Sequence, residues 1–592
     1  MRAVAAAAGP RTVFDRRGTI MEMNRRTFVS ASVAASAAAL SASAALAEEA
    51  SDATSTEEQD WLGEAPVIDD ADLELEETCD VVVVGLGNAG VVAYRSAAEA
   101  GAQVIAVEKS ETDNATGGQF ALIGGAYEER WNRADLDKEQ IINEHMLESS
   151  YMCKRAIMSR YAYEVADMFD WLVQPMVDDM WVGDSNMADV PDGVTNYLLP
   201  DNHPLPDGYD WQAETIPTFP TTVNFGSMAE QHAAQIKAAE DTGNAKAYYG
   251  HFAEKLITDE DGRVTGVYVR NAETGKYKKL TANKGVILTT GDYSSNTAMV
   301  EHFIPETIEN GVTPMWIHVD VEGNMTNTGD GHKMGAWIGA DIQQHHATND
   351  HHMGGGADIS GQGVMGINGY LNLNLLGQRF MNEDVPGCQI QAQIELQPGR
   401  KTYQFFDSSW PEQVGSFPYE HGCVNYCLSS DEMPKNNSGA SFYCRTPESV
   451  DEAVEAGTAF RADTLEELLD QLGDIDKQTA LASIEHYNEV CASGKDTDFG
   501  KNASRLFPLE NPPYYACSFV PAIMLVAMGG LKSDEECHVY NTEGNVIEGL
   551  YVAGNVQGDR FAVTYPISLK GLSIGMAQFY GYVAGQNAAA QA

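Results

Sequence analysis

The sequence predicts an α/β fold in which one domain is interrupted by a second. A β-branched run at residues 80–84 ends in a glycine-rich turn, and a helical stretch at 91–100 and a second strand at 103–107 follow it. Near the other end of the chain, an apolar strand at 549–553 again leads into a glycine. A length of 592 residues is too great for a single core. We therefore expect a Rossmann-like domain, assembled from two distant parts of the chain, with an α+β domain inserted between them.

The other elements follow from the pattern of apolar residues. Residues 248–281 contain alternating segments around a glycine at 262, which predicts a small antiparallel ribbon. The apolar run 284–289 predicts a further buried strand. Helical periodicity predicts two helices at 464–472 and 479–491, and a last helix at 573–590 that closes the chain.

The first 47 residues have the composition of a targeting signal. Arg25-Arg26 precedes a weakly apolar run at 30–45 that ends in small residues suitable for cleavage. This pattern is typical of a twin-arginine signal, which predicts export to the periplasm or another extracytoplasmic site. An ordinary secretory signal and an uncleaved anchor are the alternatives. Residues 48–77 are acidic and rich in Ser and Thr, and we expect them to form a linker.

The charge balance limits the possible partners. The chain has 37 Lys and Arg against 86 Asp and Glu, a formal net charge of −49. Such an acidic surface repels phosphate backbones, which argues against nucleic acid as a partner. It would suit a cationic electron-transfer protein, although solubility explains it as well. Beyond residue 47, no stretch is long and apolar enough to predict a direct membrane span.

The turn Gly85-Leu86-Gly87-Asn88-Ala89-Gly90 has the spacing of a dinucleotide-binding loop and lies between a strand and a helix, as such a loop requires. Gly85 permits the tight turn, Gly87 lets a diphosphate approach the backbone, and Gly90 lets the helix pack on the strand. The diphosphate would lie at the helix N-terminus. Glu108, at the end of the next strand, would accept hydrogen bonds from the ribose hydroxyls. A glycine-rich turn without a nucleotide is the alternative.

Further glycine turns favour FAD as the dinucleotide. Gly117-Gly118 and Gly124-Gly125 follow Glu108 closely, and Gly554 follows the C-terminal strand. An extended FAD uses glycine turns from both ends of a chain, whereas NAD rarely does.

These motifs resemble those of the flavoprotein subunits of fumarate reductase and succinate dehydrogenase, and more closely the soluble exported branch that includes urocanate reductase. The resemblance covers about residues 78–590. Besides the glycine turns, the segments that carry it are Thr290-Gly291-Asp292, Thr328-Gly329-Asp330-Gly331, Gly377-Gln378-Arg379-Phe380-Met381-Asn382-Glu383, Tyr487-Asn488 and Met528-Gly529-Gly530.

The resemblance implies an FAD-binding domain in two parts, 78–341 and 516–592, with a capping domain at 342–515. It also implies a substrate held between cap and flavin, with hydride passing to one alkene carbon while a protein acid protonates the other. The cofactor-binding residues that the turns and the resemblance together predict are Gly85, Gly87, Ala89, Gly90, Glu108, Lys109, Gly117, Gly118, Gln119, Gly124, Gly125, Ala253, Asp330, Gly554, Asn555, Ser573 and Ile574.

The chain departs from the family pattern at the catalytic positions. The family's arginine acid would lie just after Glu383, where residues 384–388 contain no arginine. The family's Glu and Arg proton relay corresponds to Gly363 and Gly366, and the histidine before the Met-Gly-Gly turn to Leu525 or its neighbours. A dicarboxylate needs two cationic groups and an acid, so fumarate itself is not expected as the substrate.

Three residues remain as catalytic candidates. Arg560 could bind a carboxylate or support charge on an activated alkene, or it could be a structural arginine paired with Asp559. His346 has a counterpart among the family's substrate-site histidines. Tyr565, in a Tyr-Pro pair similar to that of the 3-ketosteroid dehydrogenases, could donate a proton, or it could pack over the flavin. Arg400 is a further candidate acid, but a surface position is the expected one.

Metal and haem chemistry find little support. His345-His346 and His351-His352 lack a Cys or Glu that would complete a metal site, so no catalytic metal is expected. Cys423 and Cys427 match no strong ligand spacing and are expected to be thiols. The chain contains no Cys-x-x-Cys-His haem motif, so a separate cytochrome or flavoprotein should supply electrons.

The resulting prediction is an exported FAD-dependent oxidoreductase that reduces an activated carbon–carbon double bond, in an α,β-unsaturated acid or an enone, as part of anaerobic respiration. A ketosteroid-type dehydrogenase or hydrogenase is the alternative within the same chemistry. A flavin-binding electron carrier without catalysis is the alternative from another class.

Overall fold

The computed structural model describes residues 12–14, 20–22 and 61–591, except for 134–135, 185–189, 192, 201–208, 211–212, 215, 316, 350–363, 386, 418–423, 430–443 and 522. The chain divides into two units, Met1–Gln59 and Asp60–Ala592. In the first unit, β1 (Thr12–Phe14) and β2 (Ile20–Glu22) form an antiparallel pair. The predicted twin-arginine motif and the apolar run that follows it lie outside the described residues.

The second unit is built on an eight-stranded sheet whose central strands run parallel. The parallel strands are, in spatial order, β24 (Val546–Val552), β12 (Tyr277–Leu288), β3 (Leu73–Val84), β4 (Val104–Glu108) and β9 (Ala245–Tyr249). The antiparallel strands of the same sheet are β11 (Val264–Asn271), β10 (His251–Thr258) and β23 (His538–Tyr540). The predicted parallel strands and the antiparallel ribbon are therefore confirmed, although β3 begins well before residue 80 and β12 joins the end of the predicted ribbon to the strand predicted at 284–289.

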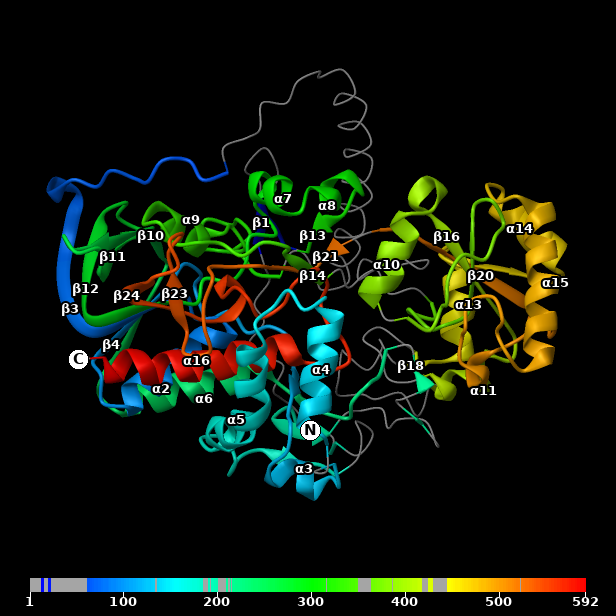
Figure 1. The fold of residues 1–592 in the computed structure, drawn as a ribbon, viewed down its shortest axis with the longest axis horizontal. Coiled ribbons are helices and arrows are strands. Elements are labelled where there is room, and N and C mark those ends of the chain that lie inside the picture. The colour runs from blue at the N-terminus through cyan, green and yellow to red at the C-terminus, as the bar shows by residue number, and fades with distance from the viewer. Residues whose placement is uncertain are drawn as a thin grey trace, which may run out of the picture. The chain divides into compact units, whose positions relative to one another are not determined.

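Both faces of this sheet are buried. Along β3, Val81 and Val83 face one apolar cluster, whereas Val82 and Val84 face another. The first cluster includes side chains from α2 (Asn88–Glu99) and α16 (Leu572–Ala590), which run side by side (Figure 1). The second lies under the antiparallel ribbon and α9 (Asp330–Trp337). Burial on both faces explains why residues 81–84 are all valine, without polar alternation.

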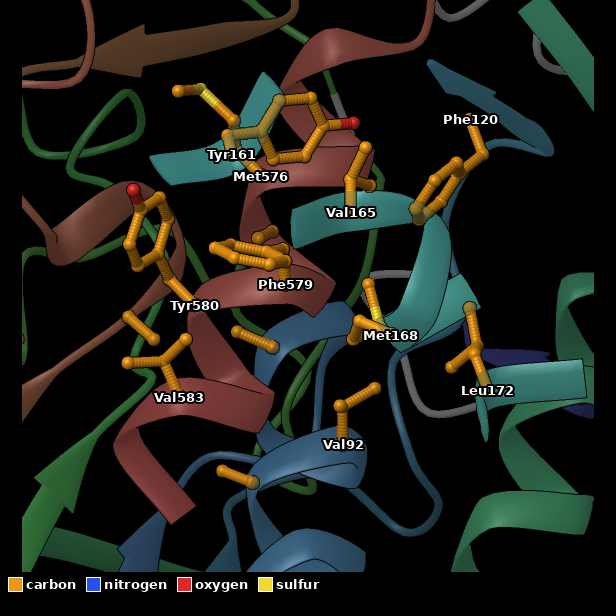
Figure 2. Close-up of a cluster of buried hydrophobic side chains, with 14 of the residues drawn as sticks. Val92, Phe120, Tyr161, Val165, Met168, Leu172, Met576, Phe579, Tyr580 and Val583 are labelled. Atoms are coloured by element: carbon orange, nitrogen blue, oxygen red, sulfur yellow. The ribbon is translucent and has the colours of Figure 1, made fainter. Parts of the chain in front are cut away.

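One large apolar cluster joins the two ends of the unit (Figure 2). In it, side chains of α5 (Arg155–Val173) face those of α16, and Phe120 of β5 (Gln119–Ala121) lies at its edge. The rings of Tyr161 and Phe579 meet edge to face, with centroids 5.5 Å apart. The C-terminal helix and elements near the start of the unit therefore share one core, as the two-part domain requires.

The prediction of a linker up to residue 77 is wrong for its last part. β3 begins at Leu73, and the carboxylates of its first half face lysines of β12: Glu74 pairs with Lys278 at 2.9 Å and Glu76 with Lys279 at 3.2 Å. Upstream, the ring of Trp61 packs edge to face against Phe303 at 5.0 Å. The acidic composition that suggested a linker is thus balanced by lysines that lie far along the chain.

The inserted domain has its own sheet and core, which confirms the predicted α+β insertion. Its strands are, in spatial order, β15 (Leu371–Asn374), β16 (Thr402–Asp407), β20 (Tyr514–Phe519) and β19 (Phe460–Ala462). α14 (Leu465–Leu472) and α15 (Lys477–Ser493) pack on it in one apolar cluster, and both were predicted. β20 crosses residue 515, where the capping domain was expected to end.

The two connections between the domains pair with each other. β14 (Ala347–Asn349), on the outward connection, runs antiparallel to β22 (Val526–Met528) on the return. β13 (Thr313–Pro314) also pairs with β21 (Ile523–Met524) of the return connection. In the part of the chain that is described, no helix has both the length and the hydropathy needed to cross a bilayer.

The remaining described elements cover the sheets or connect them. The helices are α3 (Ala126–Arg130), α4 (Lys138–Glu148), α6 (Met228–Asp241), α7 (Thr297–Phe303), α8 (Pro305–Glu309), α10 (Gly387–Glu395), α11 (Trp410–Gln413) and α13 (Pro447–Glu455). The strands are β6 (Trp181–Val182), β7 (Tyr197–Pro200), β8 (Thr222–Phe225), β17 (Tyr426–Cys427) and β18 (Cys444–Arg445).

Candidate functional site

The glycine-rich turn after β3 has the shape of a diphosphate cradle. Gly85 has φ +97°, and a Cβ there would lie 2.7 Å from the carbonyl oxygen of Thr289. A Cβ on Gly90 would lie 1.9 Å from the carbonyl oxygen of Gly85, so helix and turn touch backbone to backbone. Gly87 differs, because a Cβ there would meet only the Asn114 carbonyl oxygen, at 3.9 Å. The backbone at Gly87 therefore faces open space, as close approach of a diphosphate requires.

The amide groups at this turn are suited to an anion. α2 begins at Asn88, and its N-cap, Gly87, provides no side chain to bond the first N–H groups. Those N–H groups and the helix dipole favour negative charge in front of them. The turn thus fits the diphosphate of FAD, whose predicted position it is.

Glu108 is oriented by the same turn. Its buried carboxylate accepts hydrogen bonds from the backbone N–H of Leu86 at 2.8 Å and of Ser110 at 2.9 Å, and from the Asn114 amide at 3.0 Å. A carboxylate offers about four acceptor positions, so capacity for a ribose hydroxyl remains. The first two bonds fix the carboxylate at the carboxyl end of β4, beside the turn.

Two further predicted cofactor residues bind each other. The Lys109 ammonium lies 2.8 Å from the Asp330 carboxylate and donates to the Thr328 hydroxyl at 2.8 Å. Asp330 opens α9, and Lys109 follows Glu108 directly. The pair therefore joins the edge of β4 to α9. The strand β10, which carries Ala253, also contacts α9.

The second set of glycine turns meets the N-terminus of α16. A Cβ on Gly117 would lie 2.4 Å from Cδ1 of Ile574, so this turn lies directly against the first residues of that helix. Gly118 and Gln119 continue into β5, which pairs with β8. Gly125 packs against Ala166 of α5 instead. The structure thus brings Gly117 and Ile574 together and places Gly124 near Lys138 of α4 and Gly125 against α5.

The C-terminal turn completes the cradle. A Cβ on Gly554 would lie 3.1 Å from the Cβ of Ala89, which places this turn against the first turn of α2. The Asn555 side-chain oxygen accepts a hydrogen bond of 2.9 Å from Arg560 Nη2. Asn555 therefore joins the predicted cofactor residues to the leading catalytic candidate.

Arg560 is a buried cation without an acidic partner in the described part of the chain. The residue is 2% exposed, and among the described residues its guanidinium donates only to neutral oxygens, those of Asn555 and of the Gln557 backbone. Asp559, the partner considered above, pairs with Lys154 at 3.0 Å. Nη1 of Arg560 has no hydrogen-bond partner among the described residues. Burial lowers the pKa of Arg560 to about 10, so it stays charged at neutral pH.

Tyr565 lies in the same loop, near Arg560. Its buried hydroxyl oxygen accepts a hydrogen bond of 3.1 Å from the backbone N–H of Ser573, at the start of α16. Its ring meets Phe561 nearly edge to face, with centroids 5.3 Å apart. The Ser573 N–H, a predicted cofactor contact, is therefore directed at Tyr565 here.

His346 lies in an aromatic cluster and is held from both sides of its ring. Nε2 lies 2.9 Å from the carbonyl oxygen of Gln343, and Nδ1 accepts from the hydroxyl of Tyr293. Phe303 stacks on the ring at 4.6 Å, and burial lowers the pKa of His346 to about 3. This neutral, fully bonded imidazole is suited to holding its neighbours in place.

Other predicted positions show how the site departs from the family. Arg400 is exposed and donates to the Glu309 carbonyl. Asp384, just after the motif where the family's arginine acid would lie, binds Arg505 at 2.9 Å. Sequence reasoning missed Arg505, and it missed Gln343, whose side-chain amide contacts the Arg560 loop. Neither residue lies in a recognisable motif, so no signal in the sequence could have found them.

The possible metal ligands do not gather in the described residues. There, no group of three or more His, Cys, Asp or Glu side chains could hold an ion. Cys427 and Cys444 are free thiols on neighbouring strands. His351, His352, Gly363 and Cys423 lie outside the described residues.

Comparison with known proteins gives a consistent picture. A family model described as "FAD binding domain" matches residues 80–571. The chain is 26% identical to the digoxin reductase of Eggerthella lenta, over 97% of this chain and 98% of that protein. It is also 26% identical to the urocanate reductase of the same organism, over 92% and 80%. The solved 3-ketosteroid-Δ4-(5α)-dehydrogenase of Rhodococcus jostii has the same fold, with a TM-score of 0.63, 21% identity, and coverage of 89% and 100%.

Proposed function

The chain belongs to the FAD binding domain family, and from this premise we propose that it reduces an activated carbon–carbon double bond in a small organic molecule. It is a FAD-dependent oxidoreductase, as the resemblance predicted. The proposed substrate is an α,β-unsaturated acid or an enone, and it would bind near Arg560.

The observation that carries this proposal is the state of Arg560. A guanidinium removed from water without an ionic partner costs several kcal/mol of stability. Among the residues that the structure describes, its Nη1 has no partner and its neighbours are neutral, which leaves the positive charge available to a ligand. A carboxylate or a conjugated carbonyl oxygen matches this charge, and the oxygen of an enone gains negative charge as the double bond is reduced.

The chain's own residues would bind the substrate and provide the proton. Reduced FAD, when bound, supplies a hydride. Arg560 would hold the conjugated oxygen and stabilise its charge. Tyr565, in the same loop, is the proposed proton donor to the other alkene carbon, because a phenol can give up its hydrogen. His346 would act indirectly, by keeping Gln343 and Tyr293 in place.

The test uses the purified holoenzyme. Its FAD is reduced anaerobically, and the absorbance of oxidised flavin is followed while acrylates, simple enones and steroidal enones are added in turn. Return of the absorbance with an acrylate or enone supports the proposal. Reoxidation by artificial dyes alone would favour the electron carrier and overturn it.

A variant of Arg560 tests its role separately. Arg560→Met should abolish reoxidation by the substrate, while reoxidation by dyes and FAD content remain unchanged. Arg400→Met, at an exposed arginine, is the matched control and should behave as the wild type. Wild-type rates in Arg560→Met would rule out its proposed role.

A steroid-type reaction is the second candidate. The observation that favours it is the buried Tyr565, in the Tyr-Pro pair that the ketosteroid dehydrogenases also carry. In support, the chain is 28% identical to a 3-oxosteroid 1-dehydrogenase of Mycolicibacterium smegmatis over 56% of this chain. Reoxidation by a steroidal enone but not by acrylates would favour this candidate.

We also propose that the protein is exported and receives electrons from a separate cytochrome or flavoprotein. The arginine pair at 25–26 and the apolar run after it support export, and the acidic surface would suit a basic donor. Replacing both arginines by lysine should leave the protein in the cytoplasm, as cell fractionation would show. Normal export of that variant would contradict the twin-arginine route.

A further inference from the structure

The loop that carries Arg560 is strained at both ends. Asp559 has φ +63° and Val563 has φ +67°, in the left-handed region that residues other than glycine seldom adopt. For a β-branched residue such as valine this conformation is a clear outlier. Strain of this kind persists only where surrounding contacts impose it, and it occurs most often at functional sites.

The contacts that impose it come from the outward connection to the capping domain. The Gln343 side-chain oxygen accepts from the backbone N–H of Asp559, and its NH₂ group donates to the carbonyl oxygen of Phe561 at 2.8 Å. The carbonyl oxygen of His345 accepts from the N–H of Val563 at 2.9 Å. Two residues of the connection thus bond the loop on both sides of Arg560.

Gln343 is itself held firmly. It is 4% exposed, and its backbone N–H donates to the carbonyl of Gly530 at 2.9 Å. Its own carbonyl receives the Nε2 hydrogen of His346, at 2.9 Å. Every polar group of Gln343 therefore has a partner, which makes it a rigid support.

The chemistry of these contacts requires an amide side chain. One atom must accept from an N–H while its neighbour donates to a carbonyl, and only Gln and Asn offer both groups without charge. An ionised Glu would accept from Asp559 but repel the Phe561 carbonyl, whereas a protonated Glu could form both bonds.

We propose that Gln343 is a positioning residue that sets the place of the Arg560 guanidinium. The proposal rests on the role proposed for Arg560 above. Because Gln343 lies four residues before β14, which pairs with β22, the same contact also joins the connections of the cap to Arg560. A shift of these connections would therefore change the position of Arg560.

The experiment compares Gln343→Met and Gln343→Glu with the wild-type holoenzyme. Gln343→Met keeps the length of the side chain but forms neither hydrogen bond. We expect at least a tenfold loss in kcat for the substrate found by flavin reoxidation, with unchanged FAD content. Hydrogen exchange at the backbone N–H of Asp559, which loses its acceptor, should also become faster. Gln471→Met, on the cap, removes a single exposed bond to a carbonyl and is the matched control, with wild-type kcat.

Gln343→Glu separates positioning from a merely structural role. Its activity relative to the wild type at each pH should rise as the pH falls from 8 to 5, because protonation restores the bond to Phe561. A ratio that does not change with pH, or wild-type kcat in Gln343→Met, would overturn the proposal. Should Arg560→Met retain full activity, the role proposed for Arg560 fails, and this inference fails with it. If Arg560→Met loses activity and Gln343→Met does not, the positioning role of Gln343 is wrong while the role of Arg560 stands.

Discussion

Replacing either of two glycines of the same turn by alanine should impair a different property of the protein. Gly87→Ala adds a methyl group to open space, whereas Gly90→Ala adds one where the backbone of Gly85 already lies. We therefore expect the first to impair FAD binding with little effect on folding. The second should impair folding itself.

The structure gives the magnitudes. Gly87 has φ −84° and ψ −166°, which alanine adopts readily, and the nearest atom to its Cβ is 3.9 Å away. The loss of N-cap preference and the gain from a stiffer unfolded chain are each under about 1 kcal/mol and of opposite sign. The added methyl would occupy the path of the diphosphate, and we expect at least a hundredfold weaker FAD binding, about 2.7 kcal/mol.

For Gly90, the approach of 1.9 Å to a backbone oxygen cannot be relieved by a side-chain rotation, since helix and turn must separate. Overpacking of this kind costs about 1–3 kcal/mol and sometimes more.

The assay titrates FAD into the apoprotein and follows quenching of flavin fluorescence, with thermal unfolding of the apoprotein measured in parallel. Gly415→Ala, at an exposed glycine without a positive φ and with no atom nearer to its Cβ than 4.0 Å, controls for a general effect of removing a glycine. Wild-type FAD affinity in Gly87→Ala would refute the assignment of this turn as the diphosphate cradle. Unchanged apoprotein stability in Gly90→Ala would refute the packing argument.

Three other predictions concern stability. Arg379→Met should lower the free energy of unfolding by about 3–5 kcal/mol in urea titrations, because it removes the cation that pairs with Asp496 and leaves buried Glu383 with Lys501 alone, at 3.5 Å; a loss below about 1 kcal/mol would contradict this. Arg379 also helps to lower the pKa of Asp496 to about 2, so in the wild type this contribution is present above pH 4 and disappears as the pH falls towards 2. Trp61→Ala should lower the melting temperature by removing the contact with Phe303, whereas an unchanged value would mean that residues near 61 add nothing to the core. Burial lowers the pKa of His145 and His332 to about 4 and of His346 to about 3, so below about pH 6.5 the unfolded chain binds protons that the folded chain does not. The free energy of unfolding should therefore decrease as the pH is lowered, by up to about 1.4 kcal/mol per pH unit for each histidine. Calorimetry at pH 5.5 should detect proton uptake on unfolding.

Local pattern was sufficient for the elements that are buried on both faces or bounded by glycine. The valines at 81–84 predicted β3, and the turn after them predicted α2, because burial and glycine conformation leave direct marks in the sequence. The start of β3 was missed because the residues that balance its carboxylates lie on β12. A charged segment can be assigned to a linker or to a strand only when the partners of its charges are known.

The glycine turns expected to bind the cofactor were predictable because glycine conformation leaves a direct mark in the sequence. The contacts around Arg560 were not predictable. Gly85 and Gly90 are required by the backbone around them. Arg560 was found through a motif, but that no described carboxylate pairs with it is a property of the fold. Gln343 carries no signal at all, since it acts by bonding the backbone of residues that are distant in sequence.

The charge of Arg560 also limits which substrate can bind. In the described part of the chain, Asn555 and the Gln557 carbonyl give Arg560 dipoles but no negative charge, so one anionic or polarised oxygen of a ligand can balance it. Arg505 is also buried and binds Asp384, which follows the motif that ends at Glu383. It is already neutralised by Glu214 and Asp384. A second carboxylate on the ligand needs a second cation, and burying it without one costs several kcal/mol. Fumarate should accordingly fail to reoxidise the flavin under conditions in which a monocarboxylic acrylate or an enone succeeds. Rapid reoxidation by fumarate would show that a second cation reaches the site and that Arg560 does not act alone.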